Sequence, residues 1–230
     1  MRAGKLSGLA AGAKTGQAGR MVGRIITTEE DIAEGAAWLA ATEPRFARAL
    51  ERTGPWPLRR REDGFDALRD AILGQQVSTA AARSIRGRLI EAGFGAAPAL
   101  AEASEDDLRS CGLSRQKVRY LQALARSGID FDALRQLPDA QVFETLLPLP
   151  GIGRWTVEMY LIFALGRADV FAVDDLALAE AARMLFDLPE RPKPRAFGTL
   201  SAPWSPWRAV AARGLWAYYA AMKDREGVAP

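Results

Sequence analysis

The sequence predicts an all-α fold, and three observations support that class. Apolar residues recur at the helical spacing of three and four residues along most of the chain after Thr28. Strand signals are almost absent, and residues 169–173 are the only short extended candidate. Residues that start helices divide the chain into roughly ten segments. A chain of 230 residues with 49% hydrophobic residues can bury a core, as one domain or as two small lobes.

Most of these segments begin at a residue that caps free backbone N–H groups, or at a proline. Thr28, for example, precedes three acidic residues, which favour the positive end of a helix dipole. The expected helices start at Thr28, Pro44, Asp63 or Gly64, Ser78, Ser104, Ser114, Pro138 or Asp139, Arg154, Asp174 and Trp207. Residues 53–57 and 93–98 are expected loops. Residues 188–206 hold five prolines and are an expected connection.

Composition excludes several kinds of chemistry. The chain has no histidine and a single cysteine, Cys111. This excludes histidine acid–base catalysis, a disulfide framework, and zinc or iron–sulfur sites built on cysteines. No run of about 18 apolar residues predicts a membrane span, and no signal peptide is expected. Any catalysis must therefore use Asp, Glu, Lys, Tyr, Ser or Cys111.

Positive charge is unevenly distributed. The net charge is +3 with a pI near 9.2, which permits a nucleic-acid partner without requiring one. Residues 1–24 carry five basic residues and no acidic one, so we expect a disordered basic tail before a domain at residues 25–230. Further basic clusters occur at residues 59–61 and at Arg115, Lys117 and Arg119. These clusters contact phosphate or are simply solvated helix faces.

The most informative segment is residues 149–156, Leu-Pro-Gly-Ile-Gly-Arg-Trp-Thr. Pro150 cannot extend the preceding helix, and glycines allow two helices to pack closely. Free N–H groups at the start of the next helix favour an anion. A Gly-x-Gly turn alone is often only a helix connection, but the whole string predicts a DNA-binding hairpin over residues 139–166. The residues expected at the DNA backbone are Gly151, Gly153, Arg154 and Thr156.

Together with other motifs, this hairpin resembles the helix-hairpin-helix superfamily of DNA glycosylases, and more narrowly the DNA-3-methyladenine glycosylase II family. The resemblance covers residues 55–220. Its other pieces are Ile72-Leu73-Gly74-Gln75-Gln76-Val77-Ser78, Gly112-Leu-Ser-x-x-Lys117-x-x-Tyr120, Asp169-Val-Phe-x-x-Asp174-Asp175-Leu176, Trp204-x-Pro-Trp207-Arg208 and Trp216. The resemblance implies two helical lobes around a central cleft.

Two departures from relatives refine this expectation. Some relatives carry an N-terminal β-rich domain, for which too few residues precede Thr28. Endonuclease III-like relatives carry an iron–sulfur loop and a lysine two residues after the second hairpin glycine. Here the cysteines are missing and Trp155 stands at that position. The resemblance therefore implies a monofunctional glycosylase without lyase activity, iron–sulfur cluster or organic cofactor.

Two adjacent carboxylates, Asp174 and Asp175, open the helix that follows the hairpin. Either can cap that helix. Cleavage of a glycosidic bond requires a carboxylate near a sugar that becomes oxocarbenium-like. The resemblance puts Asp175 at the catalytic position, which leaves Asp174 as the expected cap, because adjacent residues point in different directions.

Aromatic residues predict the base pocket. Trp155 and Trp216 match pocket positions of the family, and Met159 stands where relatives can carry another aromatic residue. A cation over an indole face gains about 0.5–2 kcal/mol, which suits the positive charge of an alkylated purine. Trp204 and Trp207 are expected in the core.

Two further roles come from the resemblance. Gln76 matches the wedge residue that fills the space left by a flipped base, although Gln75 and Gln76 are equally suited to capping or inter-helix hydrogen bonds. A monovalent cation, K⁺ or Na⁺, is implied at the backbone carbonyls of Leu149 and Gly151.

These features predict an enzyme of base excision repair that removes alkylated bases, typified by 3-methyladenine and 7-methylguanine, from double-stranded DNA. Two alternatives stay open: a glycosylase for deaminated or oxidised bases, and a non-catalytic helix-hairpin-helix protein. The expected protein is a cytoplasmic, nucleoid-associated monomer that binds damaged DNA and no membrane.

Overall fold

The structure, a computed structural model, describes residues 22–223. The described part is all-α, as predicted, and its only β pairing is a single bridge between Ile25 and Arg167. The α-helices are α1 (Glu29–Thr42), α2 (Pro44–Thr53), α3 (Phe65–Gly74), α4 (Thr79–Glu91), α5 (Ala97–Glu102), α6 (Glu105–Ser110), α7 (Arg115–Ala125), α8 (Phe131–Leu134), α9 (Asp139–Leu146), α10 (Arg154–Met159), α11 (Leu176–Leu185), α12 (Pro194–Ser201) and α13 (Arg208–Lys223). A π-helix, η1 (Tyr160–Ala164), continues α10, and a 3₁₀ helix, η2 (Ala202–Trp204), continues α12.

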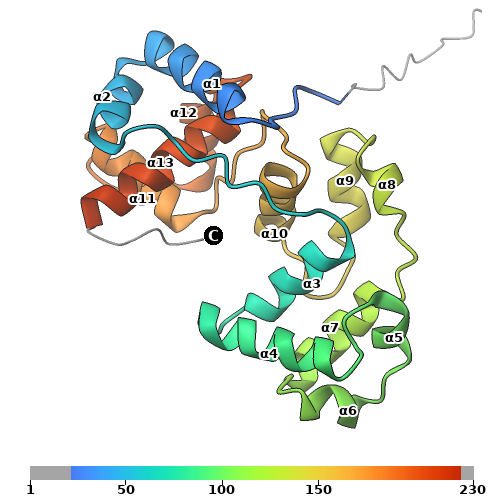
Figure 1. The fold of residues 1–230 in the computed structure, drawn as a ribbon. Helices are drawn as coiled ribbons and strands as arrows, with labels where there is room; N and C mark the ends of the chain where they lie inside the picture. Colours follow the sequence, from blue (N-terminus) through green and yellow to red (C-terminus); the bar gives the residue numbers. More distant parts are fainter. Residues whose placement is uncertain (1–21, 224–230) are drawn as a thin grey trace, which may run out of the picture.

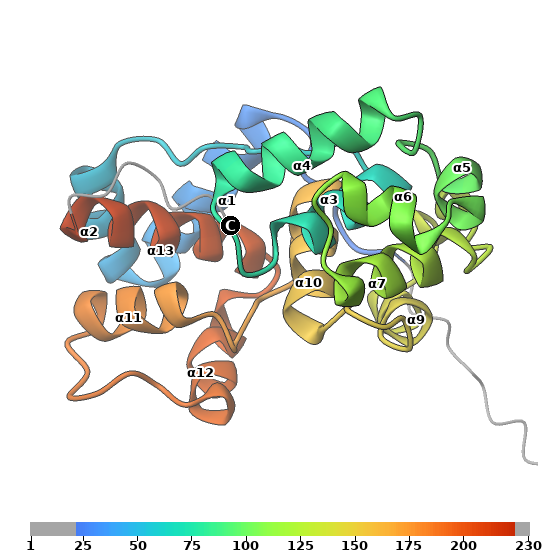
Figure 2. The same ribbon diagram turned by 90° about the horizontal axis from the view of Figure 1, so that it is seen from below.

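The helices form two lobes (Figure 1). The terminal lobe contains α1, α2, α11, α12 and α13, and so combines both ends of the described chain; α13 packs against α1, α2 and α11. The middle lobe contains α3 to α9, with α7 packed against α3, α5 and α6. Helix α10 lies between the lobes, and Figure 2 shows the same arrangement from below. The hairpin helices α9 and α10 pack against each other, and η1 contacts α3.

Several predicted helix starts are confirmed by side-chain caps. Thr28 and Asp31 form a reciprocal capping box at the start of α1. Ser78, Ser104 and Ser114 each accept a hydrogen bond from a backbone N–H three residues later. These caps are local in sequence, which is why the residue pattern revealed them.

The prediction for residues 188–206 is partly wrong, since this connection contains α12. Pro194 occupies the first turn of that helix, where a proline is tolerated. Phe197 is fully buried, with its ring centroid 4.9 Å from that of Phe171. Trp204 lies in the same aromatic cluster, 5.1 Å from Phe46. Burial of these rings holds the proline-rich segment against the terminal lobe and stabilises α12.

Other predicted boundaries also shift. The loop at residues 93–98 ends early, because α5 begins at Ala97. Residues 169–173 lie in turns and irregular backbone rather than in a strand. None of the helices within residues 22–223 has both the length and the apolar character that crossing a membrane requires.

The predicted basic tail falls mostly on residues 1–21, outside the described residues. Arg24, at its end, belongs to the folded part: its guanidinium donates to Glu34 at 2.7 Å and to Asp31 at 3.0 Å. The same group lies 4.3 Å from the centre of the Trp207 ring. Arg24 therefore connects the entry of the chain to α1 and to the start of α13.

Gly35 is required by close helix packing in the terminal lobe. A Cβ at Gly35 would lie 2.7 Å from the Trp207 ring and 2.8 Å from Val210. We therefore expect Gly35→Ala to destabilise the fold by about 1–3 kcal/mol, which lowers the melting temperature. Gly87→Ala is the matched control on α4, where a Cβ meets nothing within 4 Å. Thermal unfolding should show no loss for Gly87→Ala; an equal loss would contradict the packing argument.

Candidate active site

The carboxylate of Asp175 accepts hydrogen bonds from three helices. Its Oδ2 accepts a hydrogen bond from Trp155 Nε1 of α10 at 2.9 Å. Its Oδ1 accepts one from the backbone N–H of Leu178 in α11 at 2.8 Å and one from Trp216 Nε1 of α13 at 3.4 Å. The side chain is 9% exposed. One carboxylate thus joins the second hairpin helix to two helices of the terminal lobe.

The prediction that Asp174 caps α11 is wrong. Asp175 is the N-cap residue, with an extended backbone (φ −74°, ψ 117°) that brings its side chain to the Leu178 N–H. Asp174 is exposed and lies one position before the cap. One residue can therefore both cap the helix and take part in the chemistry. A carboxylate has about four hydrogen-bond acceptor sites, and the three N–H donors do not occupy all of them.

The structure brings together two of the three predicted pocket residues. Trp155 and Trp216 donate to the same carboxylate. Trp155 is 39% exposed, whereas Trp216 is 6% exposed and lies with its ring centroid 5.5 Å from that of Phe163. Met159 is buried one turn after Trp155. Trp155 is therefore the indole that is available to a ligand, and Trp216 supports the carboxylate from the interior.

The hairpin turn depends on one of its glycines. Gly151 has φ +85°, and a Cβ there would lie 2.3 Å from the ring of Tyr120. Gly153 has φ −91°, and a Cβ there would meet nothing within 4 Å. Only Gly151 is thus required by the backbone, while Gly153 lies in open space at the start of α10.

The residues predicted to contact the DNA backbone differ in their exposure. The Arg154 side chain is more than half exposed and lies 5.0 Å from the Phe143 ring centre. Thr156 is only 7% exposed, unlike Gly153 and Arg154. It begins a run of four consecutive buried residues, Thr156–Met159, so α10 is covered on most sides from this residue on.

Gln76 lies in the loop between α3 and α4, not inside a helix. It is exposed and has φ +57°, a conformation uncommon for residues other than glycine. Two contacts hold this loop: Lys117 Nζ donates to the Leu73 carbonyl at 2.6 Å, and Gln75 Nε2 donates to the Gly151 carbonyl at 2.8 Å. Neither contact was predicted from the sequence. For Lys117 the predicted alternatives were a contact with phosphate and a solvated helix face.

Both carbonyls of the predicted cation site accept a hydrogen bond. The Gly151 carbonyl accepts one from the Gln75 amide at 2.8 Å, and the Leu149 carbonyl accepts one from the Ile152 N–H at 3.1 Å. A carbonyl oxygen has two lone pairs, so a cation at these oxygens stays a prediction. Within residues 22–223, no group of three or more His, Cys, Asp or Glu side chains is placed to hold a metal ion.

Glu158 is a buried residue of the site that the sequence did not indicate. Its side chain is 1% exposed, and its ion-pair partner within the described residues is Arg154, whose Nε lies 3.0 Å from Oε1. Burial raises its pKa to about 7; Arg154 opposes the rise, while Asp174 and Asp175 add to it. The available signal was an acidic residue four positions after Arg154 in an otherwise apolar helix.

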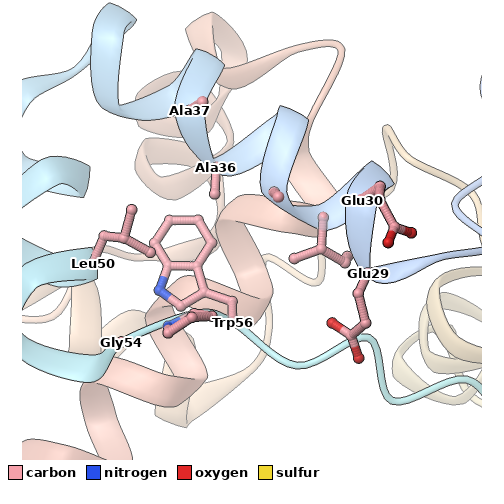
Figure 3. Close-up of a pocket in the computed structure, with 10 residues that line it drawn as sticks. Glu29, Glu30, Ala36, Ala37, Leu50, Gly54 and Trp56 are labelled. Carbon is pink, nitrogen blue, oxygen red and sulfur yellow. The ribbon is translucent and has the colours of Figure 1, made fainter.

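A hollow lies in the terminal lobe, away from these residues. It has a volume of about 470 Å³ and lies between α1 and the segment that contains Gly54 and Trp56. Figure 3 shows the Trp56 indole beneath Ala36, with Leu50 beside it. This hollow is mainly apolar and contains none of the predicted site residues.

Three comparisons relate this geometry to known proteins. Residues 70–206 match the family described as HhH-GPD superfamily base excision DNA repair protein. DNA-3-methyladenine glycosylase 1 of Schizosaccharomyces pombe is 30% identical over 190 residues, which cover 77% of this chain and 83% of the relative.

Two solved structures share the fold. One is the Schizosaccharomyces pombe 3-methyladenine DNA glycosylase (Mag1) in complex with abasic DNA, with a TM-score of 0.68, 27% identity, and coverage of 81% of this chain and 95% of that chain. The other is a DNA-3-methyladenine glycosidase from Bacillus halodurans, with a TM-score of 0.72, 29% identity, and coverage of 86% and 93%.

The two hairpin glycines give a matched pair of variants. Gly151→Ala introduces both a positive φ and a clash with Tyr120, so we expect a loss of about 1–3 kcal/mol in the free energy of unfolding. Gly153→Ala should leave the free energy of unfolding within about 0.5 kcal/mol of the wild-type value. Chemical denaturation of both variants tests this, and comparable losses would contradict the described turn.

Proposed function

We propose that this chain, which belongs to the HhH-GPD superfamily of base excision DNA repair proteins, is a monofunctional DNA glycosylase that removes alkylated bases from double-stranded DNA. The observation that carries the proposal is the Asp175 carboxylate, shared by the indoles of Trp155 and Trp216. It places a negative charge beside an exposed aromatic face. The names of the relatives support alkylated purines as the substrate class.

The geometry suits the chemistry of a cationic base. Alkylation at purine N3 or N7 gives the base a positive charge, which is attracted to the face of Trp155. A flipped nucleotide would place its sugar at Asp175, whose carboxylate stabilises the positive charge that develops as the glycosidic bond breaks. The base departs as a neutral purine, water adds to the sugar, and an abasic site remains.

The hairpin would hold the DNA backbone. Gly153 and Arg154 present exposed groups at the start of α10, where backbone N–H groups favour a phosphate oxygen. Gln76 would fill the space that the flipped nucleotide leaves, since it projects from an exposed loop tied to the hairpin by Gln75. The cation predicted at Leu149 and Gly151 takes part in no step.

The setting of this activity follows from its substrate. An enzyme of this kind works where the genomic DNA lies, so a cytoplasmic, nucleoid-associated location remains a prediction. We also propose that the protein acts as a monomer, because the carboxylate, both indoles and the hairpin come from one chain.

Asp175→Asn tests the proposed chemistry. Asparagine retains the helix cap but removes the negative charge. If that charge supplies about 3 kcal/mol of transition-state stabilisation, excision should fall by about 10²-fold or more while DNA binding is kept. The measurement is single-turnover release of 3-methyladenine and 7-methylguanine from methylated duplex DNA, with the bases identified by mass.

Asp174→Asn is the matched control, because Asp174 is exposed and makes no cap. It should retain near wild-type excision. A dead Asp174→Asn beside an active Asp175→Asn would reverse the assignment. Covalent trapping of the protein on DNA by borohydride would contradict the monofunctional mechanism, since it requires an amine at the sugar.

Trp155 should favour cationic bases. Trp155→Ala removes both the indole face and the hydrogen bond to Asp175, so excision of 7-methylguanine should fall more than excision of neutral hypoxanthine. Trp155→Phe keeps an aromatic face without the N–H donor and should lower both rates while retaining more of the preference. Equal losses for both bases in Trp155→Ala would indicate a packing role.

A further inference from the structure

Glu158 is a buried carboxyl whose position no part of the proposed chemistry explains. It lies on α10, between Trp155 and Met159, and within residues 22–223 its ion-pair partner is Arg154, whose own side chain is largely exposed. Burying a carboxylate opposes folding unless the charge is paired and hydrogen bonded, and an apolar residue at such a position is often as stable or more stable. The position therefore points to a role in function rather than in stability.

The charges that face Glu158 come from two elements. On the same helix, Arg154 forms an ion pair with Glu158, with Nε 3.0 Å from Oε1. It is the ion pair that Glu158 makes within the described residues. From the turn before α11, Asp174 and Asp175 repel it. Arg154 is therefore the only group in this set that stabilises the ionised form of Glu158.

Arg154 is poorly fixed by this pair. Its side chain is more than half exposed, and the order of arginine before glutamate at i and i+4 is the less favourable one on a helix. The same arginine stands at the hairpin surface, where it would meet a DNA phosphate. The same guanidinium would therefore pair with two anions in turn. It pairs with the buried carboxylate in the free protein and with a phosphate in the complex.

We propose that Glu158 is a positioning residue that holds Arg154 in the free protein, releases it to a DNA phosphate, and takes up a proton when it does so. This inference rests on the proposed function, because it takes the hairpin to bind DNA through Arg154. Once Arg154 turns to a phosphate, Glu158 loses its counter-charge and faces two aspartates, so its neutral form becomes the stable one.

The sign of the pH dependence follows from linkage. The pKa of Glu158 is about 7 in the free protein, and loss of Arg154 raises that pKa in the complex. A group whose pKa is higher in the complex than in the free protein takes up a proton on binding. Binding is therefore strongest at pH values below the pKa of the free protein. DNA affinity should therefore fall as pH rises above about 7, by up to tenfold per pH unit, until the pKa of the complex is reached.

The experiment measures binding of the full chain to a duplex that carries a stable abasic-site analogue, at constant salt between pH 6 and 8.5. Wild type should show the falling affinity. Glu158→Gln, which mimics the neutral carboxyl, should bind at pH 8 about as tightly as wild type does at pH 6. Glu144→Gln is the matched control, because it removes the same charge from an exposed position on α9 and should keep the wild-type slope.

A second measurement does not depend on the variant folding well. Calorimetry of wild-type binding at pH 7.5, in buffers of different ionisation enthalpy, should report uptake of up to about three quarters of a proton. The chain has no histidine, so few other groups titrate in this range. The α-amino group does titrate there, but it is unchanged in Glu158→Gln, which should lose the uptake.

The outcomes separate the two proposals. Tight, pH-independent binding with no proton uptake would overturn the role of Glu158 and leave the glycosylase assignment intact. The same slope in wild type and Glu158→Gln would also overturn it. Failure of wild type to bind the abasic duplex or to release alkylated bases would instead count against the proposed function.

Discussion

The carboxylate of Asp175 is the interaction on which the geometry of the site depends, because it joins the second hairpin helix to the terminal lobe. Its three N–H donors come from α10, α11 and α13, which are far apart in sequence. The same group caps α11, so the helix start and the site geometry are fixed together. A carboxylate held by several donors before any ligand arrives is already oriented, and orientation of this kind is what electrostatic catalysis requires.

The hairpin is held in a comparable way, but by the middle lobe. The Gly151 carbonyl accepts from Gln75, and the Gly151 Cα lies against the Tyr120 ring, where no Cβ fits. Lys117 holds the end of α3 through the Leu73 carbonyl, and burial lowers the pKa of its amine. Motif pieces that are separate in the sequence are therefore in direct contact in the fold. The loop with the predicted wedge and the loop with the predicted phosphate site are joined by the Gln75–Gly151 hydrogen bond.

The sequence was most informative where structure is determined locally. Thr28, Ser78, Ser104 and Ser114 cap helices through bonds that span three residues, and their positions were predicted. The all-α class and the pairing of the hairpin helices followed from periodicity and turn residues. By contrast, the Gln75 amide bonds a carbonyl 76 residues away, and no local pattern indicates such a partner.

The errors at the site have the same physical origin. Asp174 and Asp175 are both able to cap, and the backbone conformation at Asp175 decides between them. The residues of the hairpin do not reveal that Thr156 begins a run of four consecutive buried residues in α10. Glu158 is buried in the fold and interacts electrostatically with Asp174 and Asp175, which the sequence of α10 does not reveal.

Charge is separated across the site in a way that serves two opposed requirements. Asp174, Asp175 and Glu158 gather negative charge where a cationic base and a developing sugar cation are expected. The same charge repels DNA phosphates, which must come close for a nucleotide to reach the site. Arg154 and the free N–H groups at the start of α10 supply the opposite charge on the outer side of the same helix. If Glu158 becomes neutral as Arg154 moves to a phosphate, the repulsion falls at the stage where DNA binds, while the Asp175 carboxylate stays oriented by its three donors for the cleavage step.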